Sequence, residues 1–354
     1  ALYMLDYVLR LPPDQEIIVC VHGNYGLWHT NLSFALQMLY KLNRAVKRGT
    51  TCLLINQRSA DLDASPYFSV FWLTAHLKGI LRSRYYEGDG PQEYFVGVIP
   101  GYWSGRAEPD ESAEDGLITI MSPDPRSVAK DTAHCEEYLQ NSAPATQYGF
   151  LAQPQGDEKN AKRWASFALQ TERYANNPAE KGISAICRVP SFGVMTWEEF
   201  SHVAHKGAST DLPPYLFRDK GVFGPGPHRI ILCREDLWEA LQKKRRKNEP
   251  LSMLFHRNAY IGKDILSDQL KRIVSAMAAN PEMEVALMPR SAFNKLELEF
   301  ICWQGFAAIG WLQDGSESMF DSDPAMLNSF ASAMNYTWEK LHKGWKRRRT
   351  VMAT

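Results

Sequence analysis

The chain has 354 residues, of which 45% are hydrophobic and 23% are charged. This is ordinary globular usage, so it excludes a disordered chain, and the length predicts two domains or two fused halves. Lysine plus arginine and aspartate plus glutamate number 40 each, which excludes a global field that would draw the chain to nucleic acid. No apolar run approaches the roughly 18 residues of a membrane span, and no signal peptide is recognisable.

The six cysteines lie far apart, and none forms a CxxC pair. Four of them lie within strongly apolar runs, as Cys20 and Cys52 do. We interpret them as buried reduced thiols of a cytoplasmic protein, and we expect no metal and no cofactor. The chain begins at Ala1 in a helix-like pattern, from which we expect a further segment upstream.

The first predicted elements are a strand at residues 17–21 and a helix at 31–47, whose apolar residues recur at spacings of three and four. Gly49 is the expected helix stop. A buried strand at 52–55 follows. A long aromatic-rich insertion comes next.

Two apolar runs at residues 94–99 and 117–121 end the insertion and predict two strands. An Asp-Pro turn at 122–125 then introduces a helix at about 126–140. The last third of the chain follows a similar order. It has a helix at 263–279, strands at 283–288, 298–303 and 306–312, an Asp-Pro turn, and a closing helix after Pro324.

This shared order predicts an α/β fold of two related α/β halves, produced by a divergent duplication; chance similarity of two α/β segments is the alternative. We expect a first half at 1–150 with the aromatic insertion. The second half is expected at 228–354, with a strand at 228–233, a helix at 235–244 and a basic C-terminal helix. Residues 151–227 are expected to be a connector with a linking helix, a strand at 183–189 and Gly/Pro-rich loops. This stretch forms a small inserted subdomain or the mouth of the second half.

Motifs of several enzyme classes are incomplete. His22-Gly23 follows a strand, as in the oxyanion loop of α/β-hydrolases, but no G-x-S-x-G elbow occurs. His202 and His205 lack the further ligands and the adjacent glutamate of a zinc site. No Walker loop and no G-x-G-x-x-G after a strand is present.

His76-Leu77-Lys78 has the first part of an H-x-K-x4-D motif, and each half resembles, in its order of elements, half of a phospholipase D-like domain. The resemblance implies a histidine nucleophile, a lysine that binds phosphate and an aspartate that orients a histidine. Here Ser83 stands where the aspartate belongs, and the second half has no H-x-K. Because nucleophilic catalysis needs these groups together, we expect the fold without the reaction, and therefore not an enzyme.

Two basic clusters lie at residues 243–247 and 343–349. They are interpreted as solvated helix ends, with contacts to phosphates as the alternative. The aromatic insertion is interpreted as core, or else as the lining of a ligand pocket or partner surface. On the second interpretation, the candidate ligand-binding residues are Trp72, Arg82, Arg84, Tyr85, Tyr86, Tyr102 and Trp103.

Residues 228–354 resemble the regulatory region of large bacterial helix-turn-helix transcription regulators. The similar features are "NPEMEVAL" at 280–287, an F-x-x-D-P turn at 320–324, Phe330 and Trp338 in F-x(7)-W, and a basic end. The resemblance implies a DNA-binding domain upstream of this chain, so DNA would be reached only through that segment.

These features together predict a non-catalytic sensor or dimerisation region of a bacterial transcriptional regulator, a homodimer that binds a small effector or a partner. Two other hypotheses stand beside it. One is a phosphodiesterase-type enzyme of phospholipase D-like fold with a nonstandard site. The other is a protein-interaction scaffold that uses the aromatic insertion.

Overall fold

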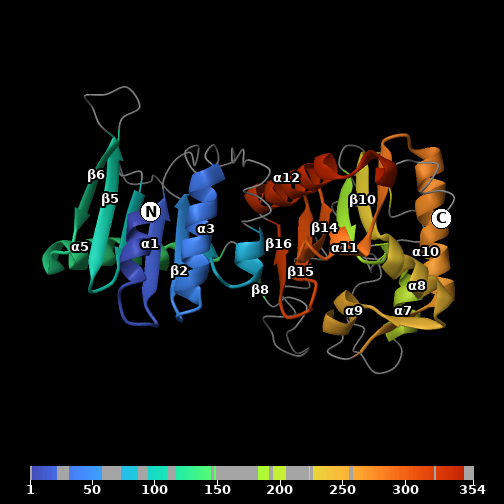
Figure 1. Cartoon of the computed structure of the whole chain (residues 1–354), viewed down its shortest axis with the longest axis horizontal. Coiled ribbons are helices and arrows are strands. Elements are labelled where there is room, and N and C mark those ends of the chain that lie inside the picture. Colours follow the sequence, from blue (N-terminus) through green and yellow to red (C-terminus); the bar gives the residue numbers. More distant parts are fainter. Residues whose placement is uncertain are drawn as a thin grey trace. The chain divides into compact units, whose positions relative to one another are not determined.

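The computed structural model describes residues 2–21, 32–57, 73–86, 95–109, 117–144, 147–148, 182–190, 194–204, 223, 226–254, 258–322 and 324–346 (Figure 1). The chain divides into two compact units, Ala1–Thr146 and Gln147–Thr354.

The first unit is an α/β unit built on one sheet. Its elements in chain order are α1 (Leu2–Val8), β1 (Glu16–Val21), α3 (Leu32–Val46), β2 (Thr51–Gln57), β3 (Arg82–Tyr86), β4 (Phe95–Ile99), β5 (Trp103–Pro109), β6 (Leu117–Ser122), α5 (Pro125–Gln140) and β7 (Ser142–Pro144).

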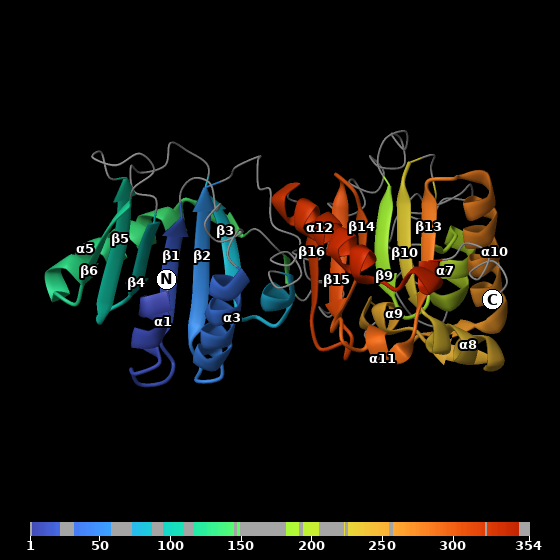
Figure 2. The same ribbon diagram turned by 45° about the horizontal axis from the view of Figure 1, so that its top comes forward.

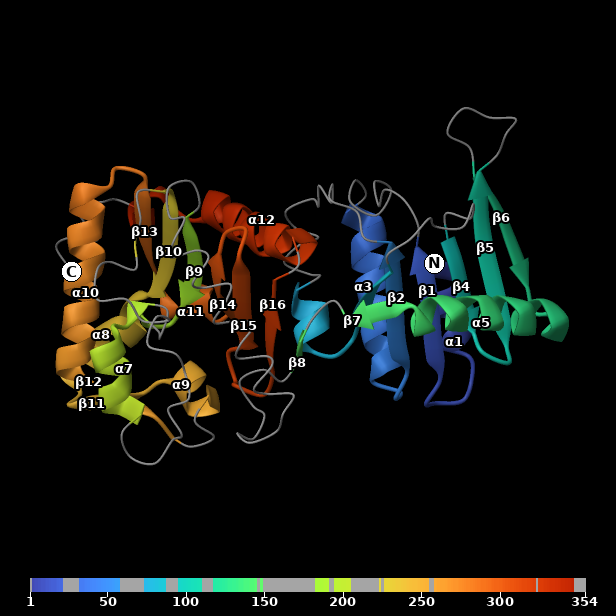
Figure 3. The ribbon, with the colours of Figure 1, turned by 180° about the vertical axis from the view of Figure 1, so that it is seen from behind.

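The sheet of the first unit has the strand order β6-β5-β4-β1-β2-β3-β7. Strands β1, β2 and β3 are parallel, whereas β4, β5 and β6 continue the sheet in antiparallel fashion. Helices α1 and α3 contact each other, and α3 contacts β2. Helix α5 lies across β4, β5 and β1 on the opposite face, where Cys135 packs on Ile18, Cys20 and Val96 (Figure 3). The result is a three-layer unit with a buried parallel centre.

The ends of the helices follow the chemistry of the sequence. Asp124 caps α5, because its Oδ2 accepts a hydrogen bond from the Ser127 backbone N–H at 2.9 Å, and Pro125 occupies the first turn. Gly49, with φ +82°, follows α3 in the left-handed conformation that glycine tolerates best. The predicted Asp-Pro start and the predicted glycine stop are both confirmed.

The second unit is built on a second mixed sheet. Its elements are β8 (Gln147–Tyr148), β9 (Ile183–Cys187), α7 (Trp197–Ala204), β10 (His228–Cys233), α8 (Arg234–Gln242), β11 (Arg245–Lys247), α9 (Glu249–Leu254), β12 (Tyr260–Gly262), α10 (Lys263–Ala279), β13 (Met283–Met288), α11 (Arg290–Phe293), β14 (Leu298–Trp303), β15 (Ala307–Leu312), β16 (Ser318–Asp321), α12 (Pro324–Lys340) and the 3-10 turn η3 (Lys343–Lys346).

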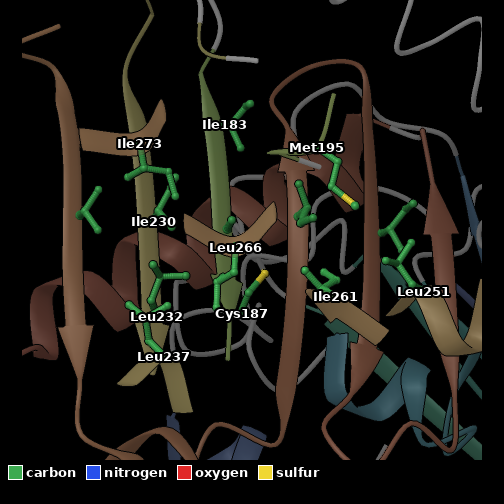
Figure 4. Packing of buried hydrophobic residues seen from close by; sticks show 14 of the residues in the cluster. Ile183, Cys187, Met195, Ile230, Leu232, Leu237, Leu251, Ile261, Leu266 and Ile273 are labelled. Atoms are coloured by element: carbon green, nitrogen blue, oxygen red, sulfur yellow. The ribbon is translucent and has the colours of Figure 1, made fainter. Parts of the chain in front are cut away.

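The second sheet has the order β13-β10-β9-β14-β15-β16-β8, with β9, β10 and β13 parallel and the remaining neighbours antiparallel. Helix α12 crosses β9, β14 and β15 on one face (Figure 2), where Phe330 packs against Phe300 with ring centroids 5.1 Å apart. The other face carries α8 and α10. Odd-numbered residues of β9, β14 and β15 join that core, together with Leu266 and Ile273 of α10 (Figure 4).

The two units share one topology. Each has three parallel strands, then three antiparallel strands that extend the sheet from the first parallel strand, then a helix across one face. On this basis β6 and α5 correspond to β16 and α12, which is the correspondence that the closing segments predicted. The described residues therefore form mixed α/β halves with two large sheets, as expected.

The shared order of elements also predicted that α10 corresponds to α3, and this pairing is wrong. Helix α10 leads into β13, the third parallel strand, so its counterpart in the first unit leads into β3 and is not α3. Strands β3 and β5 were not predicted. Strand β9 lies in the predicted connector, yet it stands between β10 and β14 in the second sheet. The predicted linking helix, at 151–182, lies almost wholly outside the described residues.

All six cysteines are buried and reduced, and burial raises the pKa of Cys52 to about 12. Among the described helices, none is long and apolar enough to cross a membrane.

Candidate functional site

The candidate ligand-binding residues of the insertion lie on two strands of the first sheet. Arg84 on β3 donates to the Ser142 Oγ at 2.8 Å, and Tyr86 packs edge-on against Tyr138 with ring centroids 4.9 Å apart. Tyr85 is buried, whereas Arg82 is exposed. These contacts tie β3 to β7 and α5.

Tyr102 and Trp103 lie at the start of β5, which β4, β1 and β2 separate from β3. At about 4.8 Å per strand this is roughly 19 Å across the sheet. Trp103 is buried against Tyr3 and Tyr7, with centroids 6.3 and 6.4 Å away. The structure therefore does not bring the β3 and β5 candidates together, and Trp72 lies outside the described residues. Their role in ligand binding stays a prediction.

The incomplete H-x-K motif has a structural contact. His76 is fully buried, and its Nε2 lies 2.7 Å from the Oγ of Ser83. Ser83 is the residue at the position of the missing aspartate. Of the remaining motif residues, His202 is exposed on α7, and His22 and His205 lie outside the described residues. Within the described part of the chain, no group of three or more His, Cys, Asp or Glu could hold a metal ion.

The second unit has a polar site that the sequence did not predict, at the carboxyl ends of its three parallel strands. Strands β9, β10 and β13 end at Cys187, Cys233 and Met288. The residues that follow are charged and include Arg188, Asp236 and Arg290. In open α/β sheets, ligands bind outside the carboxyl ends of the parallel strands.

Asp236, in the first turn of α8, is the centre of this site. Its carboxylate accepts hydrogen bonds from Arg188 at 2.9 Å, from Arg246 at 2.9 Å and from Arg290 at 3.1 Å. Burial by itself would raise the pKa of Asp236, but hydrogen bonds from Cys233, Arg246 and Arg188 outweigh it and lower the pKa to about 2. Asp236 is therefore a permanent anion that holds three guanidinium groups in place.

Glu299 on β14 is a second buried carboxyl group beside Arg188. One oxygen accepts a hydrogen bond from the Arg188 backbone N–H at 2.8 Å, and the other lies 3.4 Å from the Arg188 Nε. Burial raises the pKa of Glu299 to about 7, because Arg188 offsets only part of the desolvation. This side chain therefore changes its charge near neutral pH.

Trp311 on β15 stands directly across from Glu299 in the sheet. Its side chain is fully buried, and its indole Nε1 has no hydrogen-bond partner among the described residues. A buried N–H without a partner costs about 1–3 kcal/mol.

Arg188, Glu299 and Trp311 line one cleft with a volume of about 510 Å³, and Asp236 lies behind its lining as the ion-pair partner of Arg188 and Arg246. Its walls combine the strand ends with the β11 hairpin and α9. The lining residues are Arg188, Val189, Glu239, Lys243, Arg245, Arg246, Lys247, Asn248, Glu249, Pro250, Tyr260, Glu299, Trp311 and Gln313.

The first basic cluster, at 243–247, forms one wall of this cleft and is more than a solvated helix end. Its last three residues form β11, which pairs with β12. Arg246 turns inward to Asp236, while Arg245 lies over the Tyr260 ring at 4.8 Å. Lys243 is exposed and makes no ion pair with any residue that the structure describes. The hairpin thus holds the cluster against the cleft, which the helix pattern did not predict.

No protein-family model matches the chain, and no curated protein is similar to it in sequence. Among solved structures, the chain is similar to the crystal structure of polyphosphate kinase from Porphyromonas gingivalis. The TM-score is 0.29 at 9% identity, and the match covers 99% of this chain but 52% of that chain. This chain therefore spans about half the length of that structure, and a TM-score this low carries no argument about its reaction.

The expectation that the chain is not an enzyme is corrected: the solved structure named above is an enzyme by its title, and the missing motifs do not exclude an enzyme. The expectation rested on missing motifs alone. A missing motif excludes one arrangement of catalytic groups, whereas the cleft around Glu299 and Arg188 was invisible to a motif search.

Proposed function

We propose that the second unit binds a small oxyanion, carrying a phosphate or carboxylate group, in the cleft between the strand ends and the β11 hairpin. The observation that carries this proposal is the set of five cationic side chains in the cleft lining. Trp311 belongs to the same lining, and its indole N–H has no hydrogen-bond partner among the described residues. Phosphate and carboxylate oxygens accept hydrogen bonds from such N–H donors.

Charge supports an anion as the ligand. The cleft lining has five cationic side chains, Arg188, Lys243, Arg245, Arg246 and Lys247, against three acidic ones, Glu239, Glu249 and Glu299. Because Glu299 has a pKa of about 7, it is partly neutral at physiological pH, and the excess of positive charge grows accordingly. Guanidinium groups held by carboxylates present their remaining N–H donors in a fixed geometry, which suits phosphate and carboxylate oxygens.

The dimensions support a small molecule. Ligand pockets are typically about 300–1,000 Å³, and the cleft volume of about 510 Å³ falls in this range. Tyr260 is 41% exposed at the rim, so a planar group of the ligand could lie on its ring. The size favours a metabolite with one or two oxyanion groups over a polymer.

We propose further that this binding is the sensing step of a bacterial transcriptional regulator, as the resemblance of residues 228–354 implies. The shared topology of the units supports a phospholipase D-like plan, which stays a proposal. Contact with DNA through an upstream segment is likewise a proposal.

Thermal unfolding and calorimetry of the full chain with inorganic pyrophosphate, orthophosphate and citrate test the binding proposal. A ligand at about 100 times its Kd stabilises the folded state by about 2.7 kcal/mol. We expect at least one of the three probes to raise the melting temperature and to give saturable heat.

A charge-reversal pair serves as the decisive variant. In Lys243→Glu/Arg245→Glu, both substituted side chains are on the rim, so the fold is retained while affinity falls about tenfold or more. Lys340→Glu, an exposed reversal on α12, is the matched control and should bind as the unaltered chain does. Equal binding by the rim variant and the control, or no binding of any probe, would contradict the proposal.

A further inference from the structure

Strand β6 is one edge of the first sheet. It is the last strand of the order β6-β5-β4-β1-β2-β3-β7, so within the described residues it pairs on one side only, with β5. Ile118, Ile120 and Met121 are 48%, 50% and 49% exposed. These three side chains form a small apolar surface on both faces of the strand, since residues 118 and 120 point one way and residue 121 the other.

The second unit shows what covers this position in the same topology. Its counterpart β16 also precedes the closing helix and pairs with the strand before it. There, however, β8 adds to the outer edge in antiparallel fashion through Met319↔Tyr148 and Phe320↔Gln147. All four residues of β16 are buried. An added antiparallel strand therefore fits this edge of the fold.

The residues of β6 lack the usual protection of a free edge. Proteins keep exposed edges from pairing with charged side chains, above all lysine, with proline, or with bulges. Residues 117–122, Leu-Ile-Thr-Ile-Met-Ser, contain no charged residue and no proline. Uncharged strands of this kind can pair with themselves, because no like charges are brought opposite each other.

We propose that β6 is the dimer interface of this protein, with β6 of one copy adding to β6 of a second copy in antiparallel fashion about a two-fold axis. A second copy is the occupant because an isologous antiparallel pair satisfies the edge of both subunits at once. The first-unit sheet of one copy and the first-unit sheet of the second copy then form one continuous sheet. In this arrangement Ile118, Ile120 and Met121 are covered by the same residues of the partner. This gives the expected homodimer a defined surface, and it does not depend on the ligand-binding cleft.

Light scattering after size-exclusion chromatography, with dilution, tests the proposal. We expect a dimer for the unaltered chain, and we expect Ile120→Lys to raise the dimer dissociation constant about tenfold or more, because two like charges would meet across the axis. Tyr40→Lys is the control, since Tyr40 is a 63% exposed aromatic residue of α3 and its replacement should leave the dimer intact. A monomer at every concentration, or equal dissociation constants for the two variants, overturns the proposal.

Cysteine cross-linking tests the strand pairing itself. The six native cysteines are buried, so a cysteine introduced on β6 is the reactive thiol. We expect Thr119→Cys or Ile120→Cys to give a disulfide-linked dimer under mild oxidation, whereas Tyr40→Cys should not. If neither β6 variant cross-links while the chain is dimeric, the dimer uses another surface and the proposal fails.

Discussion

Glu299 is the residue whose chemistry most depends on its place in the fold. In an unfolded chain its carboxyl group titrates near the ordinary value of 4.5, whereas in the folded unit burial raises its pKa to about 7. The folded state therefore holds this proton over a pH range in which the unfolded state releases it. The stability contribution of the group is greatest below pH 4.5 and declines as pH rises to about 7.

Replacing Glu299 by glutamine should remove this pH dependence. At 1.36 kcal/mol per pKa unit, the group opposes folding at pH 8 by roughly 3 kcal/mol relative to pH 4. We therefore expect Glu299→Gln to gain stability relative to the unaltered chain as pH rises from 5 to 8, measured as the free energy of unfolding in urea. Glu249→Gln, at a 39% exposed carboxylate of the same cleft, is the control. Parallel pH profiles for Glu299→Gln and the unaltered chain would contradict this account.

Asp236 should make a larger contribution to stability than any exposed carboxylate, because three guanidinium groups depend on it. Removing one partner of a buried charge network typically costs about 3–5 kcal/mol. We expect a loss of this size for Asp236→Asn in chemical denaturation. Asp268→Asn, which breaks an exposed pair with Lys271, should cost less than about 1 kcal/mol. Equal losses for the two variants would show that the network is not stabilising.

At the scale of elements, the glycines that end helices form a matched pair. Gly49 and Gly79 both have positive φ, of +82° and +64°, and each follows a helical segment. An added Cβ at Gly49 would lie 1.9 Å from the Asp14 Oδ1, whereas at Gly79 nothing lies within 4 Å. An alanine at either position has to adopt a left-handed backbone conformation, and only at Gly49 does its Cβ also clash with a neighbouring atom.

We therefore expect Gly79→Ala to lower the free energy of unfolding by about 1 kcal/mol, the cost of a left-handed alanine. Gly49→Ala should cost about 0.5–1.5 kcal/mol more, because the exposed Asp14 side chain has to leave its rotamer. Urea denaturation of both variants measures the difference. If Gly49→Ala were no worse than Gly79→Ala, the contact between Asp14 and the turn would have no energetic weight.

The elements that the sequence predicted well have a clear period or a continuous apolar run. Helix α10 and strands β10, β13 and β14 were predicted at the observed residues, because each buries a face or a whole strand. Strands β3 and β5 were missed because "RSRYY" and "WSGRAEP" mix charges with aromatic and small residues. Both pair with neighbouring strands, so tertiary pairing overrides their weak local signal.

The site was missed for a different reason. Its contacts join residues far apart in the chain, such as Arg188 with Asp236, 48 positions apart, and Arg188 with Gln313, 125 positions apart. No local spacing records such contacts. One signal was present: Glu235 and Asp236 come directly after the predicted strand at 228–233, at the strand end where α/β sheets bind ligands. Recognising Arg188 needed β9, which was assigned to the connector.

At the scale of the whole molecule, the two proposed surfaces lie on different units. The cleft is made only of residues 188–313, and the β6 edge belongs to Ala1–Thr146. A ligand in the cleft adds contacts to the β11 hairpin, to the last turn of α8 and to the facing ends of β14 and β15. It adds none to the first sheet.

Hydrogen exchange of the full chain should therefore separate the two units. With saturating pyrophosphate we expect slower exchange in peptides that cover residues 234–262 and 298–313, because local opening there must release the ligand. Peptides that cover β1, β2 and β4 should exchange as they do without ligand. At a pyrophosphate concentration near the Kd of the unaltered chain, the Lys243→Glu/Arg245→Glu variant should show little protection, because its affinity is about tenfold lower. Protection of the first sheet, or equal protection of the variant and the unaltered chain at this concentration, would place the ligand elsewhere and remove the cleft from consideration as the binding site.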